Sequence, residues 1–138
     1  QVHDGDRLLR RWVAVVEPSG PADLAENAIL YLPRAPVIKP CVATRAGVIG
    51  AMDTRAIGIA VLVMGGGRRD ATDAIDPRVG LSEMCALGNR VEVGQPLAMV
   101  HGANEADTEA AIAAIRAAVT IGDDFQSGAV ILERIVAP

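Results

Sequence analysis

Aromatic side chains are scarce in this 138-residue sequence, which contains one tryptophan, one tyrosine and one phenylalanine. Proteins that bind single-stranded nucleic acid stack bases on several aromatic rings of one surface, so these few scattered rings argue against that function. Basic charge is low as well, because the formal net charge is -4 and Lys39 is the only lysine. This sign of charge is wrong for a surface that neutralises a phosphate backbone.

Cysteines and long apolar runs are also rare. Cys41 and Cys85 form no CxxC motif, so they predict neither a zinc ribbon nor a thioredoxin-type redox site. Two isolated thiols are typical of a reducing compartment, and we expect a cytoplasmic protein. The longest apolar run, residues 56–64, is far shorter than the roughly 20 residues of a membrane helix. No signal peptide is recognisable, and the first residue, Gln1, suggests a piece of a longer protein.

Hydrophobic residues as a whole are abundant, at 51% of the chain, which is enough to form the core of one domain. Residues 6–17 predict an amphipathic helix with Leu8, Leu9 and Trp12 on one face. Several valines in this segment lower its helix propensity, so a strand is the alternative prediction. A second short helix is expected from Pro21.

Two closely spaced prolines, Pro33 and Pro36, favour an extended connector after these helices. We therefore expect residues 1–36 to be a helical lead-in and connector from a missing upstream domain. Residues 37–138 would form the domain itself, with a fold of the α+β class.

Within this domain, the apolar pattern predicts short strands around residues 37–42 and 48–49, and a hairpin turning at Gly94. The run at 56–64 fits either a buried strand or a buried helix. Further along the chain the sequence predicts three more elements. They are a short helix over residues 82–87 with Ser82 as N-cap and Gly88 as its end, a helix over 107–121 followed by Gly122, and a final strand over 129–136.

The most conspicuous candidate site is the run Gly65, Gly66, Gly67, Arg68 and Arg69. Glycines allow backbone N–H groups to approach an anion, and arginines add forked donors. The spacing fits neither a dinucleotide-binding loop nor a Walker loop. A turn after a buried element, with both arginines in solvent, is therefore the alternative interpretation.

Other candidate residues favour structural roles. Asp70, Asp73 and Asp76 recur at intervals of three, but they lack the glycine and the distal glutamate of a calcium loop, and Asx turns or caps explain them equally well. His101 has no nucleophile or acid at a spacing that suggests a triad. No constellation in the sequence combines nucleophile, base and orienting group, so we expect no catalytic residue and no metal site in this chain.

Several motifs in order resemble a known family. They are residues 20–23, 31–33, 52–58, 64–69, 73–76, 79–80, 87–88, Val91, 94–98 and His101. This set resembles the C-terminal domain of the thymidine phosphorylase and pyrimidine nucleoside phosphorylase family, over roughly residues 12–123. A match to one glycine-rich turn would be unspecific, whereas this many motifs in order are specific.

The resemblance implies an α/β-hammerhead type of domain whose β segments are similar to the barrel-sandwich motif of biotinyl and lipoyl carriers. Family enzymes are homodimers that cleave thymidine with inorganic phosphate, giving thymine and 2-deoxyribose 1-phosphate, without a further cofactor. Their phosphate- and base-binding residues lie upstream and have no counterpart here. The resemblance also implies that residues 65–69 belong to a mobile loop that faces the substrate cleft as a lid.

Two alternatives come from other classes of protein. A biotinyl or lipoyl carrier needs a lysine at the tip of a hairpin, and Lys39, the only candidate, lies beside Pro40 instead. A stand-alone scaffold or regulatory domain that has lost its catalytic part is the other alternative. The expected partners of the preferred interpretation are the upstream domains of the same polypeptide, and neither nucleic acid nor a membrane is among them.

Overall fold

The computed structural model describes residue 27 and residues 30–125. The chain divides into two compact units, residues 1–34 and 35–138. The helices expected over 6–17 and from Pro21, and the strand expected over 129–136, lie outside the described residues. In the first unit, Asn27, Leu30 and Tyr31 are helical.

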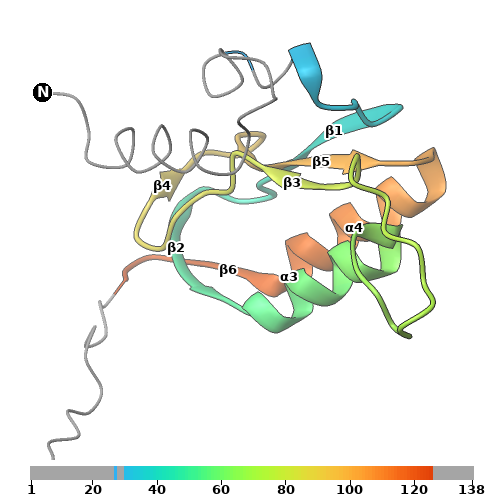
Figure 1. Cartoon of the computed structure of the whole chain (residues 1–138). Coiled ribbons are helices and arrows are strands. Elements are labelled where there is room, and N and C mark those ends of the chain that lie inside the picture. Colours follow the sequence, from blue (N-terminus) through green and yellow to red (C-terminus); the bar gives the residue numbers. More distant parts are fainter. Residues whose placement is uncertain (1–26, 28–29, 126–138) are drawn as a thin grey trace, which may run out of the picture. The chain divides into compact units, whose positions relative to one another are not determined.

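The second unit combines short strands and helices, as the α+β prediction requires (Figure 1). In chain order its elements are β1 (Val37–Val42), β2 (Gly47–Met52), α3 (Thr54–Val61), the π-helical turn η1 (Leu62–Gly66), β3 (Gly80–Ser82), β4 (Arg90–Val91), β5 (Pro96–Gly102), α4 (Glu105–Ala118) and β6 (Val119–Gly122). The predicted α+β class is thereby confirmed.

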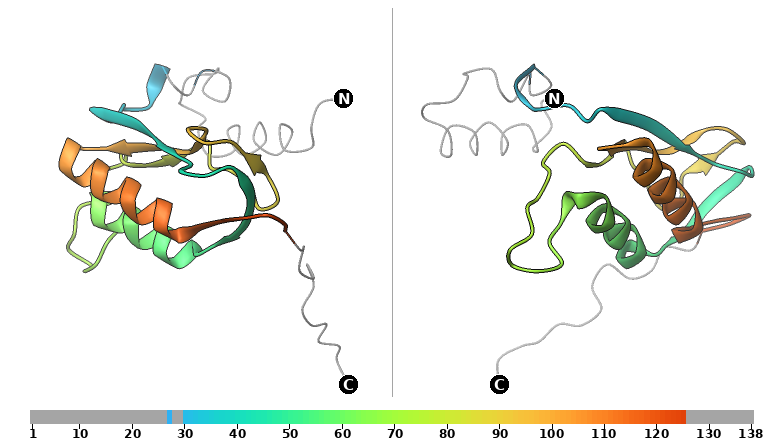
Figure 2. Two further views of the ribbon diagram at one scale, coloured as in Figure 1. Left: turned by 180° about the vertical axis from the view of Figure 1, so that it is seen from behind. Right: turned by 90° about the vertical axis from the view of Figure 1, so that its right-hand side faces the viewer.

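The strands form two small antiparallel sheets with the orders β1-β5-β3 and β4-β2-β6. Both sheets join segments far apart in sequence, because Val37 is opposite Gly102 and Met52 is opposite Val119. Helices α3 and α4 lie side by side along one side of the β1-β5-β3 sheet (Figures 1 and 2). The largest fully buried side chains fill the space between these layers, among them Ile49, Leu97, Val100 and Ile115.

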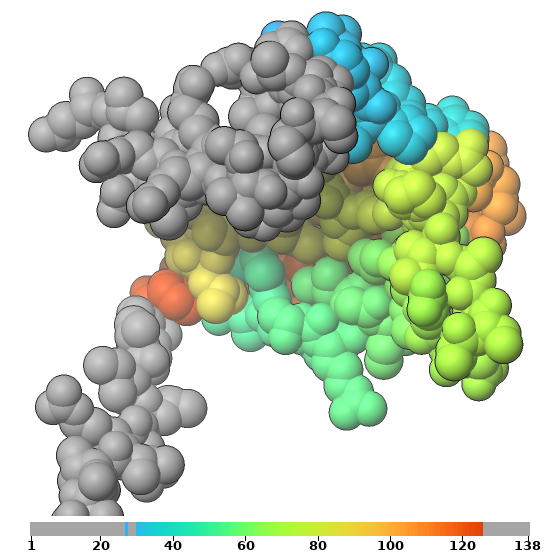
Figure 3. Space-filling model, viewed as in Figure 1, coloured from blue at the N-terminus to red at the C-terminus, as the bar shows by residue number. Residues whose placement is uncertain are grey.

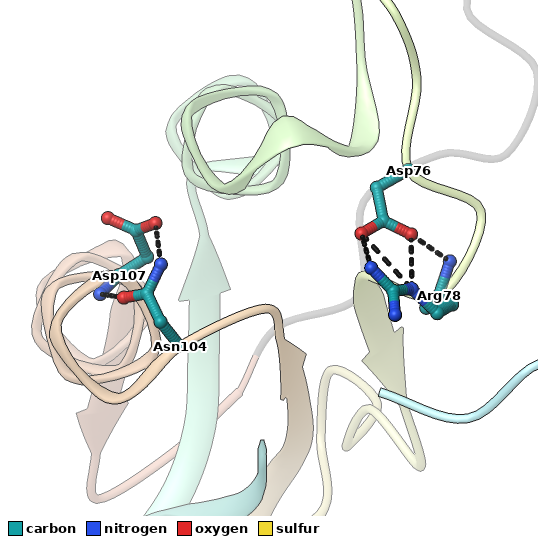
Figure 4. Close-up of polar contacts among 4 residues, drawn as sticks. All are labelled: Asp76, Arg78, Asn104 and Asp107. Atoms are coloured by element: carbon teal, nitrogen blue, oxygen red, sulfur yellow. Dashed lines mark hydrogen bonds and ion pairs between the residues drawn. The ribbon is translucent and has the colours of Figure 1, made fainter. Parts of the chain in front are cut away.

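A side-chain cap begins each of the helices α3 and α4. The Asp53 carboxylate accepts a hydrogen bond of 2.9 Å from the Ala56 amide at the start of α3. At α4 the Asn104 side chain accepts from the Asp107 amide at 2.9 Å, and its Nδ2 donates to the Asp107 carboxylate (Figure 4). Such caps satisfy amides that have no partner inside the helix. The apolar run at 56–64 is therefore a helix continuing into η1, which settles the alternative left open by periodicity.

A glycine inside α3 lowers the stability of this helix. Gly58 is exposed within the helix, and a methyl group there would meet no atom within 4 Å. Because glycine loses more backbone entropy than alanine in a helix, Gly58→Ala is expected to raise the free energy of unfolding by about 0.5–1 kcal/mol. Urea unfolding of the two proteins measures the difference, and a destabilised variant would contradict it.

The short helix predicted over residues 82–87 is wrong. Ser82 is the last residue of β3 and caps nothing, and Glu83 has a φ of 53°, which turns the chain out of a helical path. Two long-range backbone bonds then hold the segment, since the Cys85 amide donates to the Leu97 carbonyl at 2.7 Å and the Gly88 amide donates to the Ile49 carbonyl at 2.8 Å. Tertiary pairing has overridden a weak local preference for helix.

The predicted bounds of α4 differ from the observed ones by a few residues. This helix was expected over 107–121, whereas α4 covers Glu105–Ala118 and Val119 is already extended. Residues 119–122 form β6 and pair with β2. Val119 and Ile121 are β-branched residues that suit a strand, so the helical spacing of apolar residues beyond Ala118 was misleading.

The predicted turn at Gly94 is present, but it does not connect the two strands of a hairpin. Gly94 has a φ of 82°, and the Gln95 amide donates to the Glu92 carbonyl at 3.0 Å. The flanking strands lie in different sheets, because β4 pairs with β2 while β5 pairs with β1 and β3. The turn therefore carries the chain from one sheet to the other.

Across the residues that the structure describes, no helix is long and apolar enough to cross a membrane.

Candidate functional site

The glycine–arginine run lies where η1 ends and a long connection to β3 begins, and we name residues 65–79, which include the last two residues of η1, the 65–79 loop. Figure 2 shows this loop extending beyond the end of α3, and Figure 3 shows it as a raised surface at one edge of the second unit. Arg68 and Arg69 are exposed, as is Asp70. The structure thus places all five predicted site residues at the beginning of one loop.

Gly65 and Gly66 have different structural roles. Gly65 has a φ of 98°, in the left-handed region that favours glycine, and it interrupts the helical path inside η1. At Gly66 a Cβ atom would lie 2.8 Å from Val61 Cγ1 and 3.2 Å from Val79 Cγ2. Only a residue without a side chain fits between these two valines. Backbone geometry and packing therefore explain Gly65 and Gly66 without an anion.

A hollow of about 370 Å³ lies between η1 and the loop. It is lined by Leu62, Gly65, Gly67, Arg69, Asp70, Asp73 and Ala74. One arginine thus shares the hollow with two carboxylates, and this excess of negative charge disfavours an inorganic anion bound inside it. Arg68 is exposed and does not line the hollow, so its guanidinium group is accessible to an anion outside it.

Asp73 binds backbone amides that precede it in the loop. Its carboxylate accepts hydrogen bonds from the backbone amides of Arg69, at 3.0 Å, and of Asp70, at 3.1 Å. These bonds, that from Asp70 above all, lower the pKa of Asp73 below its ordinary value. Asp73 therefore has a structural role, although its bonds run to preceding amides and form no Asx turn.

Asp76 forms an ion pair with Arg78 on the far side of the loop (Figure 4). Its carboxylate accepts from Nη2 of Arg78 at 2.8 Å, from Nε at 2.9 Å and from the Arg78 backbone amide at 2.9 Å. The side-chain hydrogen bonds lower the pKa of Asp76 to about 2. Because a depressed carboxyl pKa stabilises the fold above the unfolded value of roughly 4, the pair is intact at neutral pH and is lost as the pH falls through about 2.

This ion pair was not predicted from the sequence. Asp76 was considered as one of three spaced carboxylates, and Arg78 was not considered as its partner. The sequence signal for this pair is the opposite charge of the residues on either side of Pro77, because a turn at a proline brings residues two apart toward each other.

No group of three or more His, Cys, Asp or Glu side chains in the described part of the chain is close enough to hold a metal ion.

His101 has a nearby hydroxyl group that its sequence spacing did not reveal. His101 lies on β5, and its Nε2 is 2.7 Å from Oγ of Ser82 on β3. The register places Gly80 opposite His101 and Ser82 opposite Met99, so the contact is diagonal across the two strands. Among the described residues, no carboxylate is hydrogen-bonded to the imidazole, and the pair ties β3 to β5 rather than forming a triad.

The remaining candidates are structural. Cys41 is fully buried in the core and Cys85 is partly buried; both thiols are free, and burial raises the pKa of each. A raised pKa reduces the thiolate fraction and hence the reactivity. Lys39 lies within β1 and pairs with Glu105 at 2.6 Å and Glu109 at 2.7 Å on α4. It is not at the tip of a hairpin.

A second hollow, of about 300 Å³, lies between α3 and α4. It is lined by Ala56, Ile59, Ala60, Val63, Met64, Asp107, Ala110, Ala111 and Ala114. Asp107 is the one charged residue of this lining, and its carboxylate is bonded to the Asn104 side chain. The lining therefore offers apolar surface and no free group for acid–base chemistry.

Residues 48–122 match the pyrimidine nucleoside phosphorylase C-terminal domain family. The match covers more than half of the 138 residues and includes α3, the 65–79 loop and α4. The chain therefore belongs to this family, and the resemblance noted in the sequence is confirmed. The family is one of nucleoside phosphorylases, enzymes of the pentosyltransferase class.

Proposed function

We propose that this chain is the C-terminal domain of a thymidine phosphorylase, which converts thymidine and inorganic phosphate to thymine and 2-deoxyribose 1-phosphate. The observation that carries the proposal is the family match over residues 48–122, which contains the glycine–arginine loop. Inorganic phosphate is the co-substrate in this proposal, and no resident cofactor is invoked. The complete protein is proposed to be a cytoplasmic homodimer.

The chemistry itself belongs to the upstream domains in this proposal. The described residues bring together no nucleophile, base and orienting group, and the hollow beneath the loop carries more negative than positive charge. This domain would supply a wall of the substrate cleft and a lid. Closure excludes water, which would otherwise compete with phosphate for C1′ of the sugar.

Thymine release from thymidine and phosphate tests the proposal, measured on this chain and on the complete polypeptide that contains it. We expect release by the complete polypeptide alone. Release by this chain alone would contradict the assignment of chemistry to upstream domains. If the complete polypeptide cleaves uridine but not thymidine, the family assignment stands and the thymidine assignment is wrong.

The lid role makes a separate prediction about the two exposed arginines. In the complete enzyme, Arg68→Ala combined with Arg69→Ala is expected to raise the KM for phosphate roughly tenfold, because charge-assisted hydrogen bonds to the closed site are lost. Steady-state kinetics with varied phosphate measure the change. The matched control replaces Arg55 and Arg90, which are exposed outside the loop. Unchanged kinetics for both substrates would contradict the lid role.

A carrier function is less well supported by the geometry. Lys39 is the only lysine in the sequence, and it is held in the middle of a strand by two glutamates. Attachment enzymes require a lysine presented on an exposed turn. An intact mass that includes a biotinyl or lipoyl adduct would revive this alternative.

A further inference from the structure

The 65–79 loop is closed at its base by backbone and packing contacts. The Asp76 amide donates a hydrogen bond of 2.9 Å to the Gly65 carbonyl, so the outgoing and returning parts of the loop meet there. Gly66 fits between Val61, which precedes the loop, and Val79, which ends it. We call this meeting point the neck of the loop. A loop with joined ends moves as a unit more readily than it unravels.

Asp76 links the neck to Arg78. While its amide binds Gly65, its carboxylate accepts both side-chain and backbone donors of Arg78. The Asp76 side chain is 24% exposed and the Arg78 side chain is 42% exposed, so the pair is partly shielded from solvent. Two-pronged arginine–carboxylate contacts fix direction as well as distance, so the returning part of the loop has a defined orientation at the neck.

Asp73 orders the opposite part of the loop. Its carboxylate binds the amides of Arg69 and Asp70, and its own amide donates to the Asp70 carbonyl at 3.1 Å. The backbone that carries the Arg69 side chain is thereby tied to a residue four positions later. Two of the three spaced aspartates thus bind groups within the loop, and neither is free for a metal or for proton transfer.

We propose that Asp73 and the Asp76–Arg78 pair are positioning residues, which hold the 65–79 loop in the conformation that presents Arg68 and Arg69. The effect of this conformation on phosphate rests on the proposed lid function. The ordering of the loop itself is a property of this chain alone. The two parts are therefore tested separately.

The first test uses trypsin, because the loop contains cleavable bonds after Arg68 and Arg69. Asp76→Asn in the 138-residue chain is expected to raise the initial rate of cleavage at these bonds roughly three- to tenfold, since cleavage follows the population of the opened loop. Arg78→Gln, which removes the other partner of the ion pair, is also expected to raise the rate of cleavage at these bonds. Asp123→Asn is the control, because Asp123 is an exposed carboxylate outside the loop with a single ion pair of 3.4 Å.

Hydrogen exchange gives an independent measurement for Asp73, whose substitution would alter the charge close to the cleaved bonds. Asp73→Asn is expected to speed amide exchange in peptides covering residues 66–75, while exchange in α4 stays unchanged. Cleavage and exchange that match the wild type and the Asp123→Asn control would overturn the proposal. Faster exchange throughout the domain would also overturn it, because the residues would then be general stabilisers.

The second test concerns the reaction. In the complete phosphorylase, Asp76→Asn is expected to raise the KM for phosphate in proportion to the loss of the ordered, competent fraction of the loop, with little change in kcat at saturating phosphate. If the loop opens more readily but the KM for phosphate is unchanged, the lid function is refuted and the role of these residues in ordering the loop stands. If cleavage and exchange show no change in the loop, the positioning role is refuted whatever the kinetics show.

Discussion

Replacing Gly47 by alanine is expected to lower the free energy of unfolding of this domain by about 3 kcal/mol. Gly47 begins β2 with a φ of 154°, and an added Cβ would lie 2.8 Å from Ile121 Cγ2 and nearer still to the Gly122 carbonyl oxygen. The obstacle is partly backbone, which no change of rotamer relieves. Urea unfolding of wild type and variant at one protein concentration measures the difference.

Gly94→Ala is the matched control for this substitution. Gly94 has a φ of 82°, so it carries the conformational cost, but no atom lies within 4 Å of the position of a Cβ. We expect a loss of about 1 kcal/mol from backbone strain alone. Equal losses at both positions would show that the clash at the junction of β2 and β6 is unimportant.

Ile115→Ala is expected to lower the free energy of unfolding by about 3–4 kcal/mol. Ile115 is on the inner face of α4 with no exposed surface, and it belongs to the cluster that includes Ile49 and Leu97. Truncation removes buried apolar area and leaves a cavity that packed neighbours fill only in part. Denaturant unfolding followed by circular dichroism is the measurement.

Ile115→Val tests whether the loss follows cavity size. This variant removes one methylene group and should cost about 1 kcal/mol. A loss below about 1 kcal/mol for Ile115→Ala would mean that α4 moves inward to fill the space. The same result would contradict the central place of α4 in the core.

Local sequence signals predicted the class of the fold and the location of the loop, but not the partners of the strands. The spacing of apolar residues identified α4 because Ile112 and Ile115 are buried on one face. The same spacing extended wrongly into Val119, because the hydrogen bonds that β6 makes with β2 are invisible to a local pattern. Helix α3 had a sequence signal that was not used, namely Asp53 as an N-cap directly before Thr54.

For the candidate site, too, the sequence predicted some features and not others. Residues 65–69 were recognisable because glycine runs and paired arginines are unusual in any sequence. Asp76 and Arg78 were not recognised as a pair, since their contact depends on the path of the chain around Pro77 and on the bond from the Asp76 amide to Gly65. The Ser82–His101 contact depends on the register of β3 and β5, which the sequence does not specify.

The interleaved strand order also has a consequence for biosynthesis. β1 pairs with β5, and β2 pairs with β6, so the first two strands acquire these partners only from the last third of the described chain. Contacts this distant in sequence slow folding, because a long segment must be closed before any pairing energy is gained. On the ribosome, β1 and β2 emerge well before those partners exist. The domain is therefore one that completes its folding late in translation, when its unpaired strand edges are open to chaperones.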